Sequence, residues 1–259
     1  MVNLKIAIER KSYAKNMPDV LGPLAFNVSQ GEFVSLVGPS GTGKSTLLNM
    51  IAGLEPIQDG SIRFNDQLLA GSPPCKLSYI FQQPRLMPWL IVADNLRLVM
   101  PDSAPFEIEK MLDKVGLKGK SDCYPKQLSG GMQRRVSIAR AFLTRPDVLL
   151  LDEPFISLDA PNAHRLRSLL VELWLEHKTT VVFVTHDLNE AIQLSDRIIF
   201  LSSSPGTVLL DKEVDLPRPR ADEDIHFQNW KKHLLSQNPG LLEGQADGIE
   251  YESFSGGFI

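Results

Sequence analysis

The sequence has few cysteines, no long apolar segment and no excess of basic charge. Its 259 residues include only Cys75 and Cys123, which are too few and too far apart for a disulfide framework or a metal site. No apolar run approaches the roughly 18 residues that cross a bilayer, and the first residues lack the apolar core of a secretory signal. The net charge of −4 gives no overall positive field for nucleic acid or anionic lipid. We therefore expect a cytosolic chain with no nucleic-acid partner, which binds any polyanion at a local site.

Short apolar runs alternate with segments of helical spacing along the chain. The chain is long enough to bury a sizeable α/β core, and its 43% apolar and 22% charged residues are ordinary for a globular protein. The expected strands are nearly continuous in hydrophobicity, which is typical of a parallel sheet covered on both faces. They are Phe33–Val37, Val148–Leu151, Thr180–Thr185 and Ile198–Leu201. The expected helices are Lys44–Ala52, Met132–Leu143, Asn162–His177 and Leu188–Leu194. This alternation predicts a doubly wound α/β core.

Two regions interrupt that alternation. Turn signals between Leu54 and Leu77, around a short strand at Ser61–Phe64, predict an antiparallel appendage. Between about residues 84 and 135, helical spacing punctuated by prolines predicts an inserted helical subdomain. The main domain is expected to cover residues 1–220, and residues 221–259 to form one helix over Asp222–Gln237 followed by a loosely ordered, glycine-rich tail.

A phosphate-binding loop follows the first expected core strand. The run Gly38-Pro39-Ser40-Gly41-Thr42-Gly43-Lys44-Ser45 matches the G-x-x-x-x-G-K-[ST] pattern between a strand and a helix. Backbone N–H groups of such a loop surround phosphate oxygens at a helix N-terminus, and the lysine adds a full positive charge. The Ser45 hydroxyl is a natural Mg²⁺ ligand. The predicted nucleotide-binding residues here are Gly38, Pro39, Ser40, Gly41, Thr42, Gly43, Lys44, Ser45 and Thr46.

Two acidic residues end a second core strand. Asp152 follows the apolar run Leu149–Leu151, so its carboxylate is expected at the carboxyl edge of the sheet as a Mg²⁺ ligand, directly or through water. Glu153 comes one residue later and Pro154 then breaks the strand. We expect Glu153 to act as the general base that activates water against the γ-phosphoryl group, so that the site binds ATP with Mg²⁺ and hydrolyses it.

The order of these motifs resembles that of the ATP-binding-cassette (ABC) ATPases over about residues 1–220. Leu128-Ser129-Gly130-Gly131-Met132 is similar to the family's signature sequence, in which Gln usually stands where this chain has Met132. The resemblance implies an ABC fold of the P-loop NTPase type, a mostly parallel sheet with helices on both faces. It also implies that Ser129, Gly130 and Gly131 present a hydroxyl and N–H groups to a γ-phosphate.

Further positions match the family in sequence. Gln82 resembles the Q-loop glutamine that senses Mg²⁺ and the attacking water, and His186 resembles the switch histidine that closes on the γ-phosphate. Ser157-Leu158-Asp159 resembles the D-loop, so Asp159 is expected at the subunit interface. An aromatic residue about thirty positions before the P-loop lysine stacks on adenine in the family. Tyr13 holds that place, although it is equally consistent with a half-buried strand residue.

The resemblance implies a head-to-tail pair of cassettes, because the signature of one subunit completes the nucleotide site of another. The partner is expected to be a second copy of this chain, although pairing with a different cassette stays open. Arg134, Arg135 and Arg140 are interpreted as a solvated or subunit-facing surface, not as a nucleic-acid patch.

Short segments are similar to the ATPases of nitrate, sulfonate and taurine importers, a branch that also takes up thiamine precursors. They are FQQPRLMPWLIVADNL, THDLNEAIQLSDRIIFLSSSPG and DLPRPR. The resemblance implies separate permease subunits, a solute-binding protein acting indirectly, and a position at the inner face of the cell membrane. Trp89 is either a permease contact or a packed residue. The alternatives are a soluble ABC ATPase of a non-transport assembly complex and a P-loop kinase.

Overall fold

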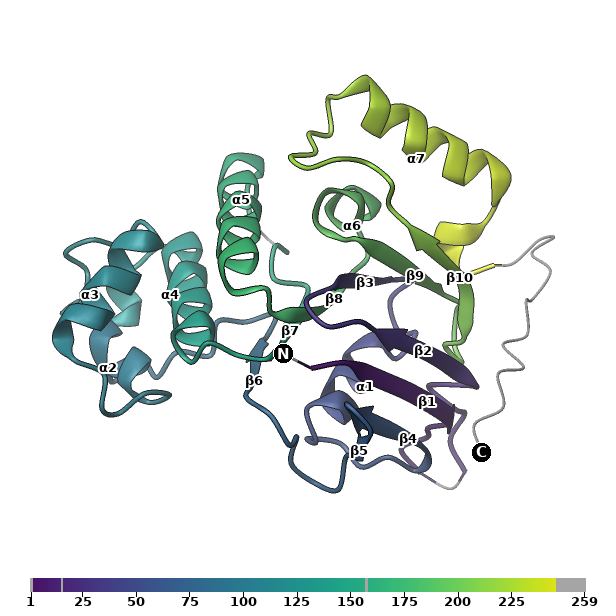
Figure 1. Cartoon of the computed structure of the whole chain (residues 1–259), viewed down its shortest axis with the longest axis horizontal. Coiled ribbons are helices and arrows are strands. Elements are labelled where there is room, and N and C mark those ends of the chain that lie inside the picture. Colours follow the sequence, from purple (N-terminus) through teal and green to yellow (C-terminus); the bar gives the residue numbers. More distant parts are fainter. Residues whose placement is uncertain (1, 15, 157, 246–259) are drawn as a thin grey trace.

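The computed structural model describes residues 2–14, 16–156 and 158–245, and a mostly parallel sheet of six strands crosses its centre (Figure 1). The strand order is β10-β9-β3-β8-β7-β6, and only the pairing of β10 with β9 is antiparallel. The strands are β3 (Phe33–Val37), β6 (Leu77–Ile80), β7 (Val148–Asp152), β8 (Thr180–Thr185), β9 (Arg197–Leu201) and β10 (Val208–Glu213). The four expected core strands and the mostly parallel α/β architecture are confirmed.

A second, antiparallel sheet has the order β2-β1-β4-β5. Its strands are β1 (Leu4–Arg10), β2 (Leu24–Val28), β4 (Asp59–Phe64) and β5 (Gln67–Leu68). The predicted appendage over residues 54–77 is confirmed in β4 and β5, but the prediction missed that β1 and β2 make up the other half of the sheet. In β1 the buried residues Leu4, Ile6 and Ile8 alternate with more exposed ones. This period of two is the signal that could have identified the strand.

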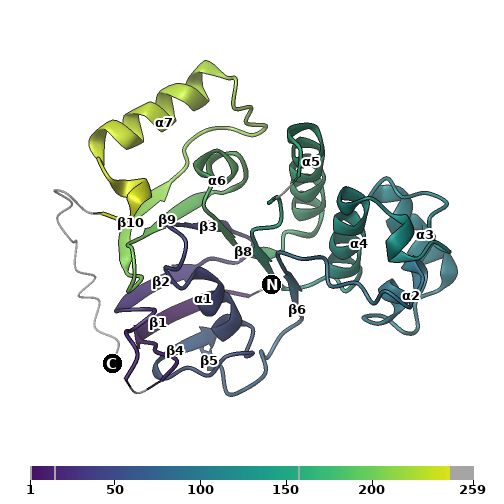
Figure 2. The same cartoon turned by 180° about the vertical axis from the view of Figure 1, so that it is seen from behind.

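Helix α1 (Lys44–Ile51) lies between the two sheets. Its Leu47, Leu48 and Ile51 share one core with Ile6 of β1 and Leu36 of β3. The opposite face of the six-stranded sheet is covered by α4 (Gly130–Leu143), α5 (Ala160–His177), α6 (Leu188–Leu194) and α7 (Ile225–Gln237). Figures 1 and 2 show α5, α6 and α7 on the side of the sheet away from α1. The expectation that both faces of the six-stranded sheet are covered is confirmed. Helix α1 and the antiparallel sheet together cover one face, and helices α4 to α7 cover the opposite face.

The helical region contains α2 (Val92–Arg97), α3 (Pro105–Lys114), a 3₁₀ turn at Pro125–Gln127 and α4. It has its own core, in which residues such as Leu96, Leu112 and Val136 pack together. Figure 1 shows α2, α3 and α4 at one end of the molecule, beyond β6. Helix α4 joins this region to the sheet, because its Phe142 packs into the core under α5.

Helices α5 and α7 begin at side-chain caps. Asp159 accepts a hydrogen bond from Asn162 N at 3.0 Å, and Asp224 accepts one from His226 N at 2.7 Å. Helix α7 therefore begins at Ile225, three residues after the expected start, and is followed by a 3₁₀ turn at Leu241–Glu243. The predicted tail lies outside the described residues from position 246 onward. No helix in the described ranges has both the length and the apolar character to cross a membrane.

Candidate active site

The phosphate-binding loop runs from the end of β3 into α1, as predicted. The side chain of Lys44 is turned back into the loop, where Nζ donates to Gly38 O at 2.7 Å, to Pro39 O at 2.6 Å and to Thr42 Oγ1 at 3.2 Å. Gly43 has a φ of 86°, and a Cβ added there would lie 2.6 Å from a methyl carbon of Leu21. Leu21 therefore packs closely against the loop, and the ammonium group of Lys44 lies on the inner, concave side of the loop.

The charge of Lys44 is balanced by two acids of the same site. Burial lowers the pKa of Lys44, while the charges of Glu153 and Asp152 act in the opposite direction. Because the loop also ends at the positive N-terminus of α1, the site combines a cation, the N–H groups of a helix N-terminus and a helix dipole, which together suit a polyphosphate.

Asp152 and Ser45 meet at the carboxyl edge of the sheet. The Ser45 hydroxyl donates to Asp152 Oδ1 at 2.9 Å. Burial raises the pKa of Asp152, and the hydrogen bond from Ser45 partly opposes that shift. A hydroxyl and a carboxylate are hard oxygen donors, which fit Mg²⁺ when phosphate oxygens and water complete its coordination. Within the described residues there is no cluster of three or more His, Cys, Asp or Glu side chains that could hold a metal.

Glu153 and His186 are brought together by neighbouring strands. Strands β7 and β8 are parallel, with Asp152 opposite Val184, so the residues that follow them share one edge of the sheet. His186 Nδ1 lies 3.1 Å from Glu153 Oε2. Glu153 has a φ of 43°, an unusual conformation for a residue with a side chain. The sharp turn after β7 thus directs the carboxylate towards the histidine and the phosphate loop.

A buried hydrogen-bond network supports the turn that holds His186. Thr185 Oγ1 donates to Glu190 Oε2 at 2.7 Å and accepts from Asp187 N at 3.0 Å. Arg167 on α5 lies 3.6 Å from the other oxygen of Glu190. The residue before the histidine is therefore tied to both α5 and α6.

Tyr13 lies beside the first turn of α1. Its side chain is 57% exposed, and its hydroxyl is 2.8 Å from Thr46 Oγ1. The ring lies 5.5 Å from the ammonium group of Lys11. Tyr13 follows β1 outside any strand, so the interpretation as a half-buried strand residue is wrong. Its exposed ring stands next to the nucleotide loop.

The structure places Gln82 in the loop after β6, with an exposed side chain. Its backbone carbonyl, together with that of Phe81 at 3.3 Å, accepts hydrogen bonds from Nη1 of Arg134. Nη2 of Arg134 lies 3.4 Å from Ile156 O in the segment after Glu153. The interpretation of Arg134 as a solvated surface residue is wrong, because the side chain is buried with 6% exposure and connects α4 to two loops of the site.

Arg140, six residues later on α4, has a similar role. It donates to Pro84 O and Arg85 O, both at 3.1 Å, and is partly buried, so its interpretation as a solvated residue is also wrong. Arg135 is half-buried and makes no hydrogen bond or ion pair within the described part of the chain. The spacing of the three arginines did not separate these environments, because only the fold places Arg134 and Arg140 against the loop after β6.

The signature residues lie at the N-terminus of α4. Ser129 is the N-cap residue, and its Oγ accepts from Met132 N at 3.3 Å. Ser129 and Gly130 are exposed, and Gly131 lies beside Asn162 of α5. In the described residues no hydrogen bond joins this cap to the phosphate loop. Ser157, the first residue of the predicted D-loop, lies outside the described residues, and Asp159 is exposed at the start of α5.

The loop between β9 and β10 packs against the back of the phosphate loop. A Cβ added to Gly206 would lie 2.2 Å from Thr42 O. Gly206 N donates to Val20 O at 3.0 Å, and Gly22 N donates to Gly206 O at 3.1 Å. This serine- and proline-rich segment carries no motif that predicts a role in the site. The close approach of two backbones explains why a glycine stands here.

Replacing Gly206 with alanine is therefore expected to displace the phosphate loop. The added methyl group cannot share space with the Thr42 carbonyl, and such overpacking costs about 1–3 kcal/mol. We expect weaker ATP binding and a lower melting temperature, measured by titration calorimetry and thermal unfolding. Ser203→Ala, which removes an exposed hydroxyl from the same loop, is the control. Unchanged ATP affinity in Gly206→Ala would show that the loop does not depend on this contact.

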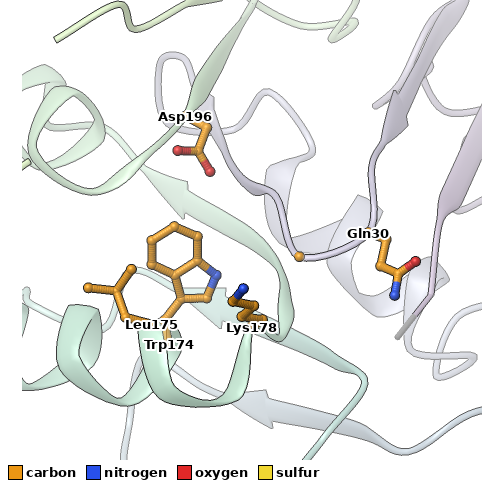
Figure 3. Close-up of a pocket in the computed structure, with 6 residues that line it drawn as sticks. Gln30, Trp174, Leu175, Lys178 and Asp196 are labelled. Carbon is orange, nitrogen blue, oxygen red and sulfur yellow. The ribbon is translucent and has the colours of Figure 1, made fainter. Parts of the chain in front are cut away.

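A hollow of about 470 Å³ lies at the amino ends of the parallel strands, opposite to the phosphate loop (Figure 3). Two of its polar side chains, those of Asp196 and Trp174, already have partners. Asp196 accepts from Arg218 at 2.5 Å and from Phe33 N at 3.0 Å, and Trp174 Nε1 donates to Thr179 O at 3.0 Å. None of the residues that line this hollow belongs to the phosphate loop, so it is not the nucleotide site.

Known proteins share both the sequence and the fold. A family model described as ABC transporter matches residues 21–156. The aliphatic sulfonates import ATP-binding protein SsuB 2 of Burkholderia cenocepacia (strain HI2424) is 44% identical over 90% of this chain and 86% of its own length. The corresponding protein of Bacillus subtilis (strain 168) is 38% identical over 97% of this chain and 98% of its own length.

Solved structures extend the likeness to three dimensions. A structure titled as the dimeric form of MJ0796, a bacterial ABC transporter cassette, superposes with a TM-score of 0.72. It is 31% identical in sequence and covers 84% of this chain and all of that one. A post-hydrolysis dimer of the same cassette, bound to ADP and Pi, has a TM-score of 0.71. The predicted fold and the predicted family resemblance are confirmed, and the chain belongs to the ABC transporter family as an ATP-binding cassette.

Proposed function

We propose that this chain is the ATP-hydrolysing subunit of an importer for aliphatic sulfonates. The observation that carries the catalytic part is the meeting of Ser45 with Asp152 and of Glu153 with His186 at one sheet edge. The substrate class rests on the curated relatives, which carry that name over nearly the full length of both chains. In this proposal Ser45, Asp152 and Gln82 would hold Mg²⁺, which would neutralise phosphate charge, and Glu153 would take the proton of the attacking water.

The other nucleotide contacts follow the same proposal. When ATP binds, Lys44 replaces its hydrogen bonds to the loop carbonyls with bonds to the β- and γ-phosphates. The loop residues from Gly38 to Gly43 donate hydrogen bonds from their backbone N–H groups to the phosphate oxygens. The exposed ring of Tyr13 stacks on the base, and its bond to Thr46 keeps it near α1. His186 approaches the γ-phosphate from the side of β8.

We also propose that two copies close head to tail around two ATP molecules. Ser129 and Gly130 are exposed at a helix N-terminus. Among the described residues they make no hydrogen bond to the phosphate loop of their own chain, so they are available to the γ-phosphate bound by a partner subunit. Asp159 is exposed at the start of the neighbouring helix. The dimeric state of the similar solved cassettes supports this arrangement. The γ-phosphate then holds the dimer closed until hydrolysis removes that contact.

The permease is proposed to dock on the loop after β6. Trp89 is 71% exposed there, which supports a partner contact over packing inside the helical region. The cassette would then sit at the inner face of the membrane, with a solute-binding protein acting only through the permease. We propose the domain division that the sequence predicts. Residues 1–220 form the ATPase domain, with a helical subdomain inserted at about residues 84–135, and residues 221–259 follow it.

Replacing Ser129 with arginine tests the dimer. We expect ATP affinity of the monomer to change less than about twofold, because Ser129 lies outside its phosphate loop, whereas ATP-driven dimerisation should be lost. Light scattering after gel filtration, in a background that does not hydrolyse ATP, measures the dimer. Loss of ATP binding by the monomer would contradict the role of Ser129 in the opposing site.

The importer itself is tested by isolating the tagged chain from gently solubilised membranes of its native source. We expect a multi-span protein at equal stoichiometry, and uptake of ethanesulfonate by the complex in liposomes with its solute-binding protein and ATP. Uptake of nitrate but not of sulfonate would overturn the substrate. A soluble complex without a membrane protein would instead support an assembly ATPase.

A further inference from the structure

Tyr79 of β6 stands next to the carboxylate that we assign to the metal. Its hydroxyl has one hydrogen, which is shared between two acceptors, Asn49 Oδ1 at 3.2 Å and Asp152 Oδ2 at 3.5 Å. Strand β6 runs parallel to β7 with Tyr79 opposite Leu150, so the ring reaches the strand end that carries Asp152. Tyr79 belongs to none of the motifs that predict the nucleotide site.

The two oxygens of Asp152 are held from different sides. Ser45 Oγ donates to Oδ1 at 2.9 Å, and the Tyr79 hydroxyl faces Oδ2. A carboxylate with a donor beside each oxygen is restricted in rotation, so Oδ1 of Asp152 keeps a fixed orientation beside Ser45. Contacts behind a metal ligand of this kind commonly govern its affinity for the metal.

The ring of Tyr79 is itself held in place by a column of stacked side chains. It stacks on Phe81 with centroids 3.9 Å apart and an interplanar angle of 17°. The guanidinium carbon of Arg85 lies 3.7 Å from the centroid of Phe81. Arg140 of α4 holds the backbone of this segment by donating to Arg85 O. The column therefore joins the carboxylate to the loop that follows β6.

We propose that Tyr79 is a positioning residue for the metal carboxylate, and that its stacking on Phe81 ties the direction of Asp152 to the position of the loop after β6. The inference rests on the proposed function, because it takes Asp152 as a Mg²⁺ ligand. Tyr79 does not contact the nucleotide in this account and acts only through Asp152.

The test measures binding of adenylyl imidodiphosphate, an ATP analogue that resists hydrolysis, with Mg²⁺ and with EDTA. In the wild-type chain Mg²⁺ is expected to strengthen binding. Tyr79→Phe keeps the ring and its stacking but loses the hydroxyl. The gain from Mg²⁺ should fall by about two- to threefold, the lower end of the effect of one hydrogen bond, because the hydroxyl shares its hydrogen with Asn49. Binding in EDTA should stay unchanged. Tyr124→Phe, which removes a hydroxyl from an exposed tyrosine, is the matched control.

Phe81→Leu separates positioning from simple packing. If Phe81 acts by aiming the Tyr79 hydroxyl, Phe81→Leu should reduce the Mg²⁺ gain in the wild-type chain but have no further effect in Tyr79→Phe. Additive losses from the two substitutions would overturn the link between them. Electron paramagnetic resonance of bound Mn²⁺ gives a second readout that does not depend on turnover.

The outcomes separate this inference from the proposed function. If the wild-type chain binds the analogue equally with Mg²⁺ and with EDTA, the assignment of a metal to Ser45 and Asp152 fails. If Mg²⁺ strengthens binding in the wild type and equally in Tyr79→Phe, only the role of Tyr79 fails. A loss that also appears in EDTA would mean that Tyr79 shapes the phosphate loop and does not act through the metal.

Discussion

Replacing Glu153 with glutamine is expected to lower ATP hydrolysis by about 10²- to 10⁴-fold while ATP binding remains. The loss of a positioned general base typically costs this much. Glutamine has the same length and can keep the unusual backbone conformation at φ 43°, so the phosphate loop should be undisturbed. Because the γ-phosphate is then retained, the variant should also accumulate the closed dimer. Phosphate release and light scattering with ATP measure the two effects.

Glu172→Gln is the matched control for this experiment. Glu172 is an exposed glutamate on α5, so the substitution makes the same change of charge away from the site. Its hydrolysis rate should equal that of the wild type. A wild-type rate in Glu153→Gln would remove Glu153 as the base and leave His186 as the residue to test next.

Replacing Arg134 with alanine is expected to destabilise the protein and to reduce hydrolysis. The buried guanidinium donates to carbonyls of two loops, those of Phe81 and Gln82 in one and of Ile156 in the other. Each buried carbonyl left without a donor costs about 1–3 kcal/mol, and partial solvation of these loops reduces that cost. We expect a loss of about 2–3 kcal/mol, which lowers the melting temperature by about 4–12 °C. Hydrolysis should fall by about tenfold because the loop that carries Gln82 loosens.

The neighbouring Arg135 provides the comparison for this change. Arg135→Ala removes a guanidinium with no hydrogen-bonding partner among the described residues, so its melting temperature should stay within about 2 °C of the wild type. Differential scanning calorimetry and phosphate release measure both variants. Equal stability of the two variants would mean that the carbonyl contacts of Arg134 contribute nothing.

The local sequence predicted those elements whose conformation is specified by residues within one short segment. The strand Phe33–Val37, the glycine-rich loop and the lysine that begins α1 are contiguous, and they form as predicted. Helix α5 is also predicted. Its cap at Asp159 makes it begin at Ala160, two residues before the expected start at Asn162. Such signals depend on backbone conformation and capping within a few residues, so they do not need the tertiary fold.

Elements that depend on distant partners were less predictable. Strand β10 pairs antiparallel with β9 and carries exposed, charged residues such as Lys212, so its pattern does not indicate a strand. For β1 the period of two indicates a strand, but its place in the antiparallel sheet comes from pairing with β4, about fifty residues later. These strands are stabilised by hydrogen bonds between segments far apart in the sequence, which local periodicity does not record.

The sequence by itself determined the chemistry of this protein. The order of its phosphate loop, acidic strand end, signature and histidine specifies a nucleotide cassette, because each motif needs particular side chains at short spacing. Only the tertiary structure decided which side chains support that chemistry. Arg134 became a buried donor because α4 packs against the loop after β6, and Tyr79 reached Asp152 because β6 lies beside β7. The hydrogen-bonding and charge environment of both side chains depends on neighbours that the fold brings from other parts of the chain.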